Sequence, residues 1–276
     1  MTYETLEANI ITWAAAQPDV RAVLAVGSKA RGDADQWSDL DLLLFTRDRE
    51  RYSTDDWLQP FGEVWLTYKD RAGPNDPEWF AIYEGGLKVD IVLLHFEEPD
   101  TDLETLLQRY PYQNVFARGI KVLFDQSGPS RVLPPKPVDL PQSPTQAEFM
   151  HVVNGFLLES VTTAKFIARG DLWRAQHWLA YDLRPNLLKL IEWHASGRDV
   201  WYNGRFMASW ADPRALDALP QTFATYERES LQSALTTLLN LCLLVGDETA
   251  DRFGFTFPRE THYRIKDLIE KILGGC

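Results

Sequence analysis

The chain has 276 residues, of which 45% are hydrophobic and 25% are charged, as is typical of a soluble globular protein with one large or two ordinary domains. Its formal net charge of −12 argues against a nucleic-acid partner, because a protein that grips a phosphate backbone needs a basic surface. The same charge would attract a cationic small molecule, and the two cysteines, Cys242 and Cys276, are too few for a disulfide framework.

The beginning of the chain carries no targeting signal that we can identify. Its first residues lack the basic and apolar regions of a signal peptide. The longest apolar run, near residues 238–245, is too short to span a bilayer. We therefore expect a cytoplasmic protein without a membrane partner.

The first half of the sequence alternates between helix and strand patterns. Apolar residues at helical spacing predict a helix over 5–16 and another over 101–108. The expected strands cover 20–26, 40–45, 62–68, 79–83, 87–94 and 120–124. The pair Gly85–Gly86 predicts a hairpin turn between two of these strands.

The second half is helical. Many prolines and little periodicity predict a linker over 131–143, which separates a domain over 1–130 from one over 144–276. Helices are expected over 145–168, 172–194, 226–245 and 261–273, with breaks at Gly170, Gly197 and Gly246. The predicted fold class is thus α+β, a mixed sheet with helices followed by an α-helical bundle.

One stretch of the first domain carries a recognisable pattern of chemistry. The segment Gly27-Ser28-Lys29-Ala30-Arg31-Gly32 follows the first predicted strand, and Asp39 and Asp41 come at the start of the second. Free N–H groups at the turn can bind an anion, and acids two residues apart on a strand share one face. This arrangement predicts a site for Mg²⁺ and a nucleoside triphosphate. The alternative is an ordinary β-turn-β with a solvated acidic edge.

The motif Gly-Ser, a spacer and Asp-x-Asp resembles that of the DNA polymerase β-like nucleotidyltransferase superfamily. The resemblance implies a nucleotidyltransferase domain with a third carboxylate on a neighbouring strand. Asp90 suits that role, because it interrupts an aliphatic strand where a bare charge is costly unless it is paired or bound to metal. Asp39, Asp41 and Asp90 would then be the metal ligands and catalytic acids. Alternatively, Asp90 lies on the solvent face of an edge strand.

The turn itself supplies the expected phosphate contacts. We expect Gly27, Ser28 and the amides around them to hold the β- and γ-phosphates. Arg31 can add a fork of charge-assisted hydrogen bonds, or it is a solvated turn residue. Lys29 is expected to be a solvated charge.

The second half is similar to the aminoglycoside 6-adenylyltransferase (streptomycin adenylyltransferase) family. The similarity rests on Trp173 and on the runs Tyr181–Trp193, Trp201–Phe206 and Phe253–Pro258. It implies transfer of AMP from ATP to a hydroxyl of streptomycin, with Mg²⁺ as the cofactor. This chain has Gly-Ser-Lys-Ala-Arg-Gly where the commonest members have Gly-Ser-Arg.

The predicted helices of the second half carry residue types that suit a polycationic acceptor. The acids are Glu159, Asp171, Asp182 and Glu192, and the aromatic residues are Trp173, Trp178, Tyr181 and Trp193. Such aromatic residues can stack on sugars or meet cations, although aromatic residues at helical spacing are usually core.

Asp182 is a candidate catalytic base for the acceptor hydroxyl, because Pro185 would place it at an irregular turn. Alternatively, Asp182 caps a new helix that begins at Pro185. Asp90 is the other candidate base.

Other functions remain compatible with the motif. The nucleotide acceptor could be another small molecule, a protein side chain or RNA, although the acidic charge argues against RNA. A non-catalytic nucleotide-binding module is the remaining alternative, and the intact set of Ser28, Asp39, Asp41 and Asp90 argues against it.

Overall fold

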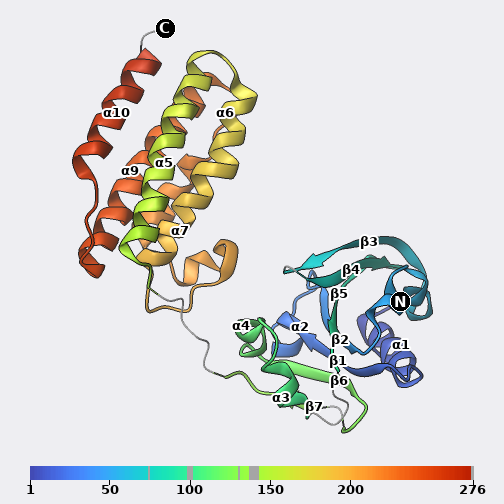
Figure 1. The fold of residues 1–276 in the computed structure, drawn as a ribbon. Helices are drawn as coiled ribbons and strands as arrows, with labels where there is room; N and C mark the ends of the chain where they lie inside the picture. Colours follow the sequence, from blue (N-terminus) through green and yellow to red (C-terminus); the bar gives the residue numbers. More distant parts are fainter. Residues whose placement is uncertain (74, 98–101, 130, 137–142, 275–276) are drawn as a thin grey trace. The chain divides into compact units, whose positions relative to one another are not determined.

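The computed structural model describes residues 1–73, 75–97, 102–129, 131–136 and 143–274. The chain divides into two compact units, Met1–Asp139 and Leu140–Cys276 (Figure 1). The N-terminal unit is built on a sheet, and the C-terminal unit consists of helices.

The N-terminal unit contains a seven-stranded mixed sheet in the order β3-β4-β5-β2-β1-β6-β7. All neighbouring strands are antiparallel except β2 and β5, which are parallel. The strands are β1 (Val20–Val26), β2 (Leu40–Thr46), β3 (Val64–Ala72), β4 (Asp76–Tyr83), β5 (Leu87–His95), β6 (Ile120–Asp125) and β7 (Arg131–Leu133).

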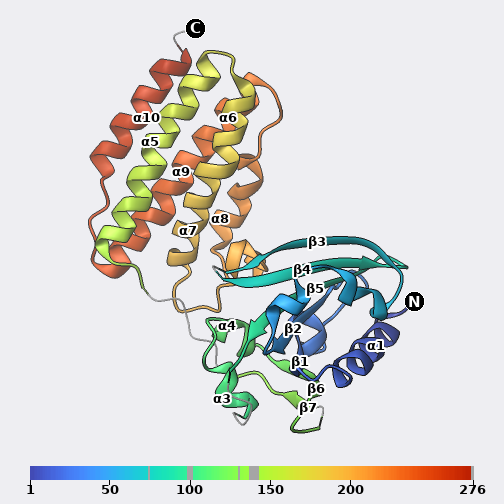
Figure 2. The same cartoon turned by 45° about the vertical axis from the view of Figure 1, so that its right-hand side comes forward.

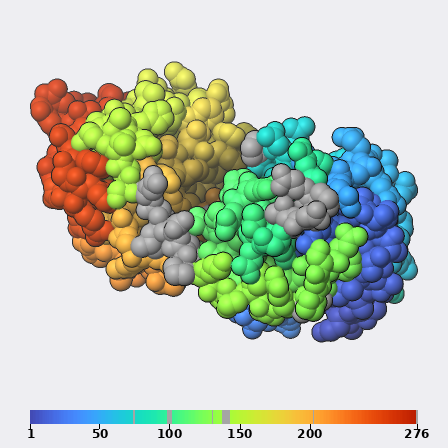
Figure 3. All heavy atoms as spheres, turned by 60° about the horizontal axis from the view of Figure 1, so that its bottom comes forward, coloured from blue at the N-terminus to red at the C-terminus, as the bar shows by residue number. Residues whose placement is uncertain are grey.

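Helices cover both faces of this sheet (Figures 1 and 2). Alternate residues of a strand point to opposite faces, so β1 sends Val23 and Ala25 into a core with α1 (Tyr3–Ala15), and Ala22 and Leu24 into a second core. The second core includes α3 (Leu103–Leu107) and α4 (Gln113–Phe116), which form part of the unit's outer surface, green in Figure 3. The remaining short elements are α2 (Gly27–Arg31) and the 3₁₀ helices η1 (Arg49–Tyr52) and η2 (Asp56–Phe61).

The C-terminal unit is a bundle whose long helices lie side by side (Figure 2). Its helices are α5 (Gln146–Ala168), α6 (Leu172–Trp178), α7 (Arg184–His194), α8 (Pro213–Ala218), α9 (Arg228–Phe253) and α10 (Arg259–Gly274). A π-helical turn, η3 (Leu179–Leu183), joins α6 to α7, and three short 3₁₀ helices are η4 (Tyr202–Gly204), η5 (Met207–Ser209) and η6 (Leu219–Thr222). One continuous apolar core runs through the bundle, and Cys242 is buried in it as a small apolar side chain.

The predicted fold class, a mixed sheet with helices followed by a helical bundle, is confirmed. One strand was not predicted: residues 131–133, expected at the start of the proline-rich linker, pair with β6 as the edge strand β7. The strand has only three residues, which is too short for a periodic pattern to reveal it. Residues 137–142 of the expected linker lie outside the described residues.

The predicted break at Gly246 is wrong. Helix α9 continues through Gly246 and ends at Gly254, whose left-handed conformation terminates it. Gly246 is needed for another reason, because a Cβ atom there would lie 2.6 Å from the ring of Phe257, which is buried in the core. The glycine therefore permits the segment after α9 to pack closely against the helix.

Among the described residues, none of the helices combines the length and apolar character that a membrane span requires.

The two glycines inside long helices make a matched test of this packing. Gly246→Ala should destabilise the C-terminal unit by about 1–3 kcal/mol, because the added methyl overpacks the contact with Phe257. Gly155→Ala in α5 should instead stabilise it by about 0.5–1 kcal/mol, because its nearest neighbour would be 3.9 Å away and alanine favours the helix. Urea unfolding of both variants measures the difference, and equal effects would contradict the packing role of Gly246.

Candidate active site

The turn after β1 is shaped by the side chain of Asp41. Gly27 has φ +70°, and a Cβ atom there would lie 2.3 Å from Asp41 Oδ2. Both features require glycine, since a side chain would be strained and would displace the carboxylate. Helix α2 begins at Gly27 after the N-cap residue Val26, whose apolar side chain cannot accept a hydrogen bond from the first turn.

The sheet register gathers three carboxylates at one place. In the parallel pair β2–β5, Asp41 lies directly opposite Asp90. Asp39 precedes Asp41 by two residues, so the pleat turns both acids toward the face that Asp90 also shares. The strand that carries Asp90 was predicted to neighbour the strand of the acid pair, and β5 does pair with β2. The alternative that β5 is an edge strand is wrong, because β5 lies between β4 and β2.

Lys88 joins two of these acids and was not identified from the sequence. Its Nζ lies 2.9 Å from Asp39 Oδ2 and 2.7 Å from Asp90 Oδ2. Lys88 precedes Asp90 by two residues on β5, so strand alternation alone places the two side chains on one face. That spacing was the available signal for Lys88.

A further acid, Glu78 on β4, was also missed. Strand pairing sets Glu78 opposite Val92 and Phe80 opposite Asp90, so Glu78 shares the face of Asp90. Burial and the charge of Asp90 raise the pKa of Glu78. Burial likewise raises the pKa of Asp90, while Lys88 acts in the opposite direction. The negative charges on this face therefore destabilise one another unless a cation neutralises them.

The donor atoms fit a divalent cation. Asp90 is largely buried, with 17% of its side chain exposed, and its Oδ1 makes no hydrogen bond within the described part of the chain. An acceptor that is buried without a partner is costly unless a cation or water satisfies it. Carboxylate oxygens are the protein ligands that Mg²⁺ prefers, so Asp39, Asp41 and Asp90 form a suitable set.

The other residues predicted for the phosphate contacts lie in or beside α2. Ser28 is partly exposed in the first turn of α2. Arg31, which is 15% exposed, donates from Nε to Asp33 Oδ2 at 2.9 Å. Lys29, expected to be a solvated charge, is partly exposed, and its Nζ lies 3.6 Å from the ring centroid of Tyr3. This cation–π contact ties α2 to α1.

Asp182, the predicted base, lies in the helical unit within the π-helical turn η3. Pro185 cannot donate a backbone hydrogen bond, and the N–H of Arg184 bonds to the carbonyl of Leu179, five residues back. The alternative that Asp182 caps a new helix is wrong, since α7 follows η3 without a side-chain cap and its N-cap residue is Leu183. Asp182 is partly exposed, and such π turns occur frequently at functional sites.

The aromatic residues predicted for acceptor contacts divide into two groups. Trp173 and Tyr181 are 75% and 72% exposed, and Tyr181 stacks on His177 with ring centroids 4.7 Å apart. Trp178 and Trp193 pack into the bundle core instead. Only the first pair is accessible to a ligand on the surface of the helical unit.

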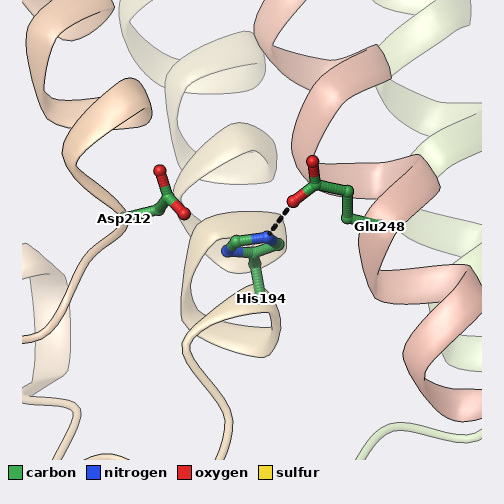
Figure 4. A group of neighbouring side chains, drawn as sticks. All are labelled: His194, Asp212 and Glu248. Atoms are coloured by element: carbon green, nitrogen blue, oxygen red, sulfur yellow. Dashed lines mark hydrogen bonds and ion pairs between the residues drawn. The ribbon is translucent and has the colours of Figure 1, made fainter.

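A second cluster of possible metal ligands lies in the helical unit: His194, Asp212 and Glu248 (Figure 4). His194 Nε2 and Glu248 Oε2 are 2.8 Å apart, and the guanidinium of Arg214 donates to both carboxylates at 2.7–3.0 Å. These bonds lower the pKa of Asp212 and of Glu248 to about 2. Because Arg214 already supplies the positive charge and occupies all four carboxylate oxygens, we interpret this cluster as a structural ion network.

Alanine variants of Gly27 and Gly32 separate the effect of backbone strain from the effect of displacing the Asp41 carboxylate. Gly27→Ala and Gly32→Ala should each cost about 1–2 kcal/mol of stability, because both positions have φ near the left-handed region, +70° and +79°. Only Gly27→Ala should also weaken Mn²⁺ binding, because nothing lies within 4 Å of a Cβ atom at Gly32. Urea unfolding and Mn²⁺ titration measure the two effects, and unchanged Mn²⁺ affinity in Gly27→Ala would contradict the close approach to Asp41.

The chain is similar in sequence to two known proteins and has also been matched to a solved structure. An aminoglycoside 6-adenylyltransferase of Bacillus subtilis (strain 168) is 24% identical over 259 residues, which cover 87% of each chain. Another aminoglycoside 6-adenylyltransferase, from Staphylococcus aureus, is 26% identical over 192 residues, covering 64% of this chain and 63% of that protein. A crystal structure of an aminoglycoside 6-adenyltransferase from Bacillus subtilis aligns over 99% of both chains with 19% identity and a TM-score of 0.46.

The comparison with protein families covers nearly the whole sequence. The streptomycin adenylyltransferase family matches residues 1–272, which include the turn, the three acids and nearly all of the helical unit. This chain therefore belongs to the streptomycin adenylyltransferase family and is a nucleotidyltransferase.

Proposed function

We propose that the protein transfers AMP from ATP to a hydroxyl of an aminoglycoside of the streptomycin type, with Mg²⁺ as its cofactor. The observation that carries the proposal is the convergence of Asp39, Asp41 and Asp90 beside the turn at Gly27. Family membership supports the reaction class, and the names of the two curated relatives support the acceptor class.

In this proposal the three acids hold the metal and the turn holds the nucleotide. Bound Mg²⁺ would neutralise the phosphate charge that grows as the α-phosphorus is attacked. Asp39, Asp41 and Asp90 provide the oxygen ligands. Ser28 and the N–H groups of the first turn of α2 bind the phosphates, and Arg31 adds a cationic donor.

The acceptor hydroxyl attacks the α-phosphorus of ATP, and pyrophosphate leaves. A general base within hydrogen-bond reach would take the proton that this hydroxyl loses, and a carboxylate can serve as one. We propose Asp182 for that role, because it lies in the irregular π turn and is partly exposed. The exposed rings of Trp173 and Tyr181, together with the chain's net charge of −12, favour a cationic sugar as the acceptor.

The proposed reaction is tested by incubating the protein with Mg²⁺, each nucleoside triphosphate and a panel of aminoglycosides, with streptomycin first. Mass spectrometry should find an acceptor that has gained one AMP when ATP is supplied. Asp39→Asn and Asp41→Asn should abolish the transfer without unfolding the protein, because each keeps the side-chain shape and removes a ligand charge.

Glu63→Gln is the matched control for these variants, because it also turns an acid into its amide and Glu63 is an exposed residue directly before β3. It should leave the transfer unchanged. Near-normal turnover in Asp39→Asn would contradict the metal site. Modification of RNA or of a protein side chain, with no aminoglycoside modified, would overturn the proposed acceptor.

The role of Asp182 has a separate test. Asp182→Asn should lower turnover by about 10²–10⁴-fold if Asp182 accepts the proton. Nucleotide affinity and thermal stability should stay nearly unchanged, because α7 does not depend on a cap from this side chain. Asp267→Asn, the same change at an exposed position of α10 in the same unit, serves as the control. Normal turnover of Asp182→Asn at saturating substrates would rule the assignment out.

A further inference from the structure

We propose that Lys88 is a counter-ion of the active site. Its ammonium neutralises Asp39 and Asp90 in the metal-free protein and leaves when a divalent metal binds. The inference rests on the proposed metal-dependent function. It adds to that function an exchange of cations, in which a divalent ion from solution replaces the ammonium of Lys88.

The geometry is that of a bridging cation. Lys88 Nζ contacts one oxygen of each carboxylate, at 2.9 Å for Asp39 and 2.7 Å for Asp90. Asp90 lies on β5 and Asp39 directly precedes the neighbouring parallel strand β2, so the ammonium links β5 to the start of β2. The ring of Phe80 also lies near the ammonium, with its centroid 5.5 Å from Nζ.

The acids need such a charge when no metal is bound. Asp39, Asp41 and Asp90 share one face with Glu78, and burial of Asp90 makes its uncompensated charge expensive. Lys88 lowers this cost and keeps two ligand side chains turned toward each other. The site is thus preorganised before the metal arrives.

The same contact competes with a bound metal. Mg²⁺ requires oxygen ligands at about 2.0–2.1 Å, and the ammonium occupies one oxygen each of Asp39 and Asp90, close to where the ion would lie. A lysine and a divalent ion on the same oxygens also repel each other. Lys88 can withdraw, because its stem is flexible and 37% of its side chain is exposed.

Lys88 is therefore a positioning residue that competes with the metal. Its charge should weaken binding of a free divalent ion, while its hydrogen bonds should stabilise the metal-free protein. A lysine that served only the structure would affect stability and leave metal affinity unchanged. The two readouts together distinguish the roles.

The test measures Mn²⁺ binding without nucleotide, from the electron paramagnetic resonance signal of free Mn²⁺, together with thermal unfolding in EDTA. Lys88→Met should bind Mn²⁺ on the order of tenfold more tightly than the wild type, because one positive charge near the ion is removed. It should also unfold at a lower temperature in EDTA and gain more stability from Mn²⁺. Lys88→Arg, which keeps the charge, should bind Mn²⁺ like the wild type.

Lys271→Met removes the same charge from an exposed position in α10 and should change neither readout. If Lys88→Met does not fold, Lys88→Gln gives the same comparison with a neutral side chain that can still donate a hydrogen bond. Mn²⁺ affinity that is unchanged or weaker in the neutral variant, with the wild type binding normally, would overturn the counter-ion role. Absence of Mn²⁺ binding in both proteins would instead overturn the metal site, and the inference with it.

Discussion

The parallel pairing of β2 with β5 is the constraint on which the proposed active site depends. It sets Asp41 opposite Asp90, with Asp39 two residues away, and so concentrates negative charge at the start of two neighbouring strands. The surrounding sequence accommodates this concentration in two ways. Gly27 leaves room for the carboxylate of Asp41, and Lys88 neutralises part of the charge. The turn, the strand pair and the lysine all contact the carboxylates, so a change in any one of them should alter the carboxylate positions or charges.

Two clusters of acids stand out in the part of the chain that the structure describes, and they differ in the basic side chain that each one holds. The guanidinium of Arg214 donates hydrogen bonds in a rigid fork geometry to both carboxylate oxygens of Asp212 and of Glu248. In the active site, Lys88 reaches only one oxygen of Asp90 and leaves Asp90 Oδ1 without a partner among the described atoms. A flexible point charge can be exchanged for a metal, whereas a bidentate guanidinium cannot easily be displaced. The number of satisfied oxygens thus distinguishes the structural network from the proposed metal site.

The helical unit combines a well-packed core with one irregular segment. Its long helices share a continuous core, and Gly246 permits the close contact of α9 with Phe257. The π turn at 179–183 departs from this regularity and carries Asp182, next to the exposed ring of Tyr181. A π turn replaces ordinary helical hydrogen bonds with weaker geometry, so its place in an otherwise regular bundle is consistent with a functional role. Asp182 as the base nevertheless remains a prediction.

Local sequence patterns were sufficient to predict the fold class, the six longer strands, the main helices and the Gly-Ser and Asp-x-Asp segments. These features depend on spacing within a few residues, which strand and helix periodicity encode directly. Contacts between distant segments were decided only by the tertiary structure. The pairing of Asp39 with Lys88 and the position of Glu78 follow from strand register, and strand β7 is too short to have a period. Gly246 shows the same limit: the sequence marked it as a helix end, but its role comes from Phe257, eleven residues further on and packed back against it. Register and packing depend on how whole elements bury one another, and that information is not present in any single stretch of the chain.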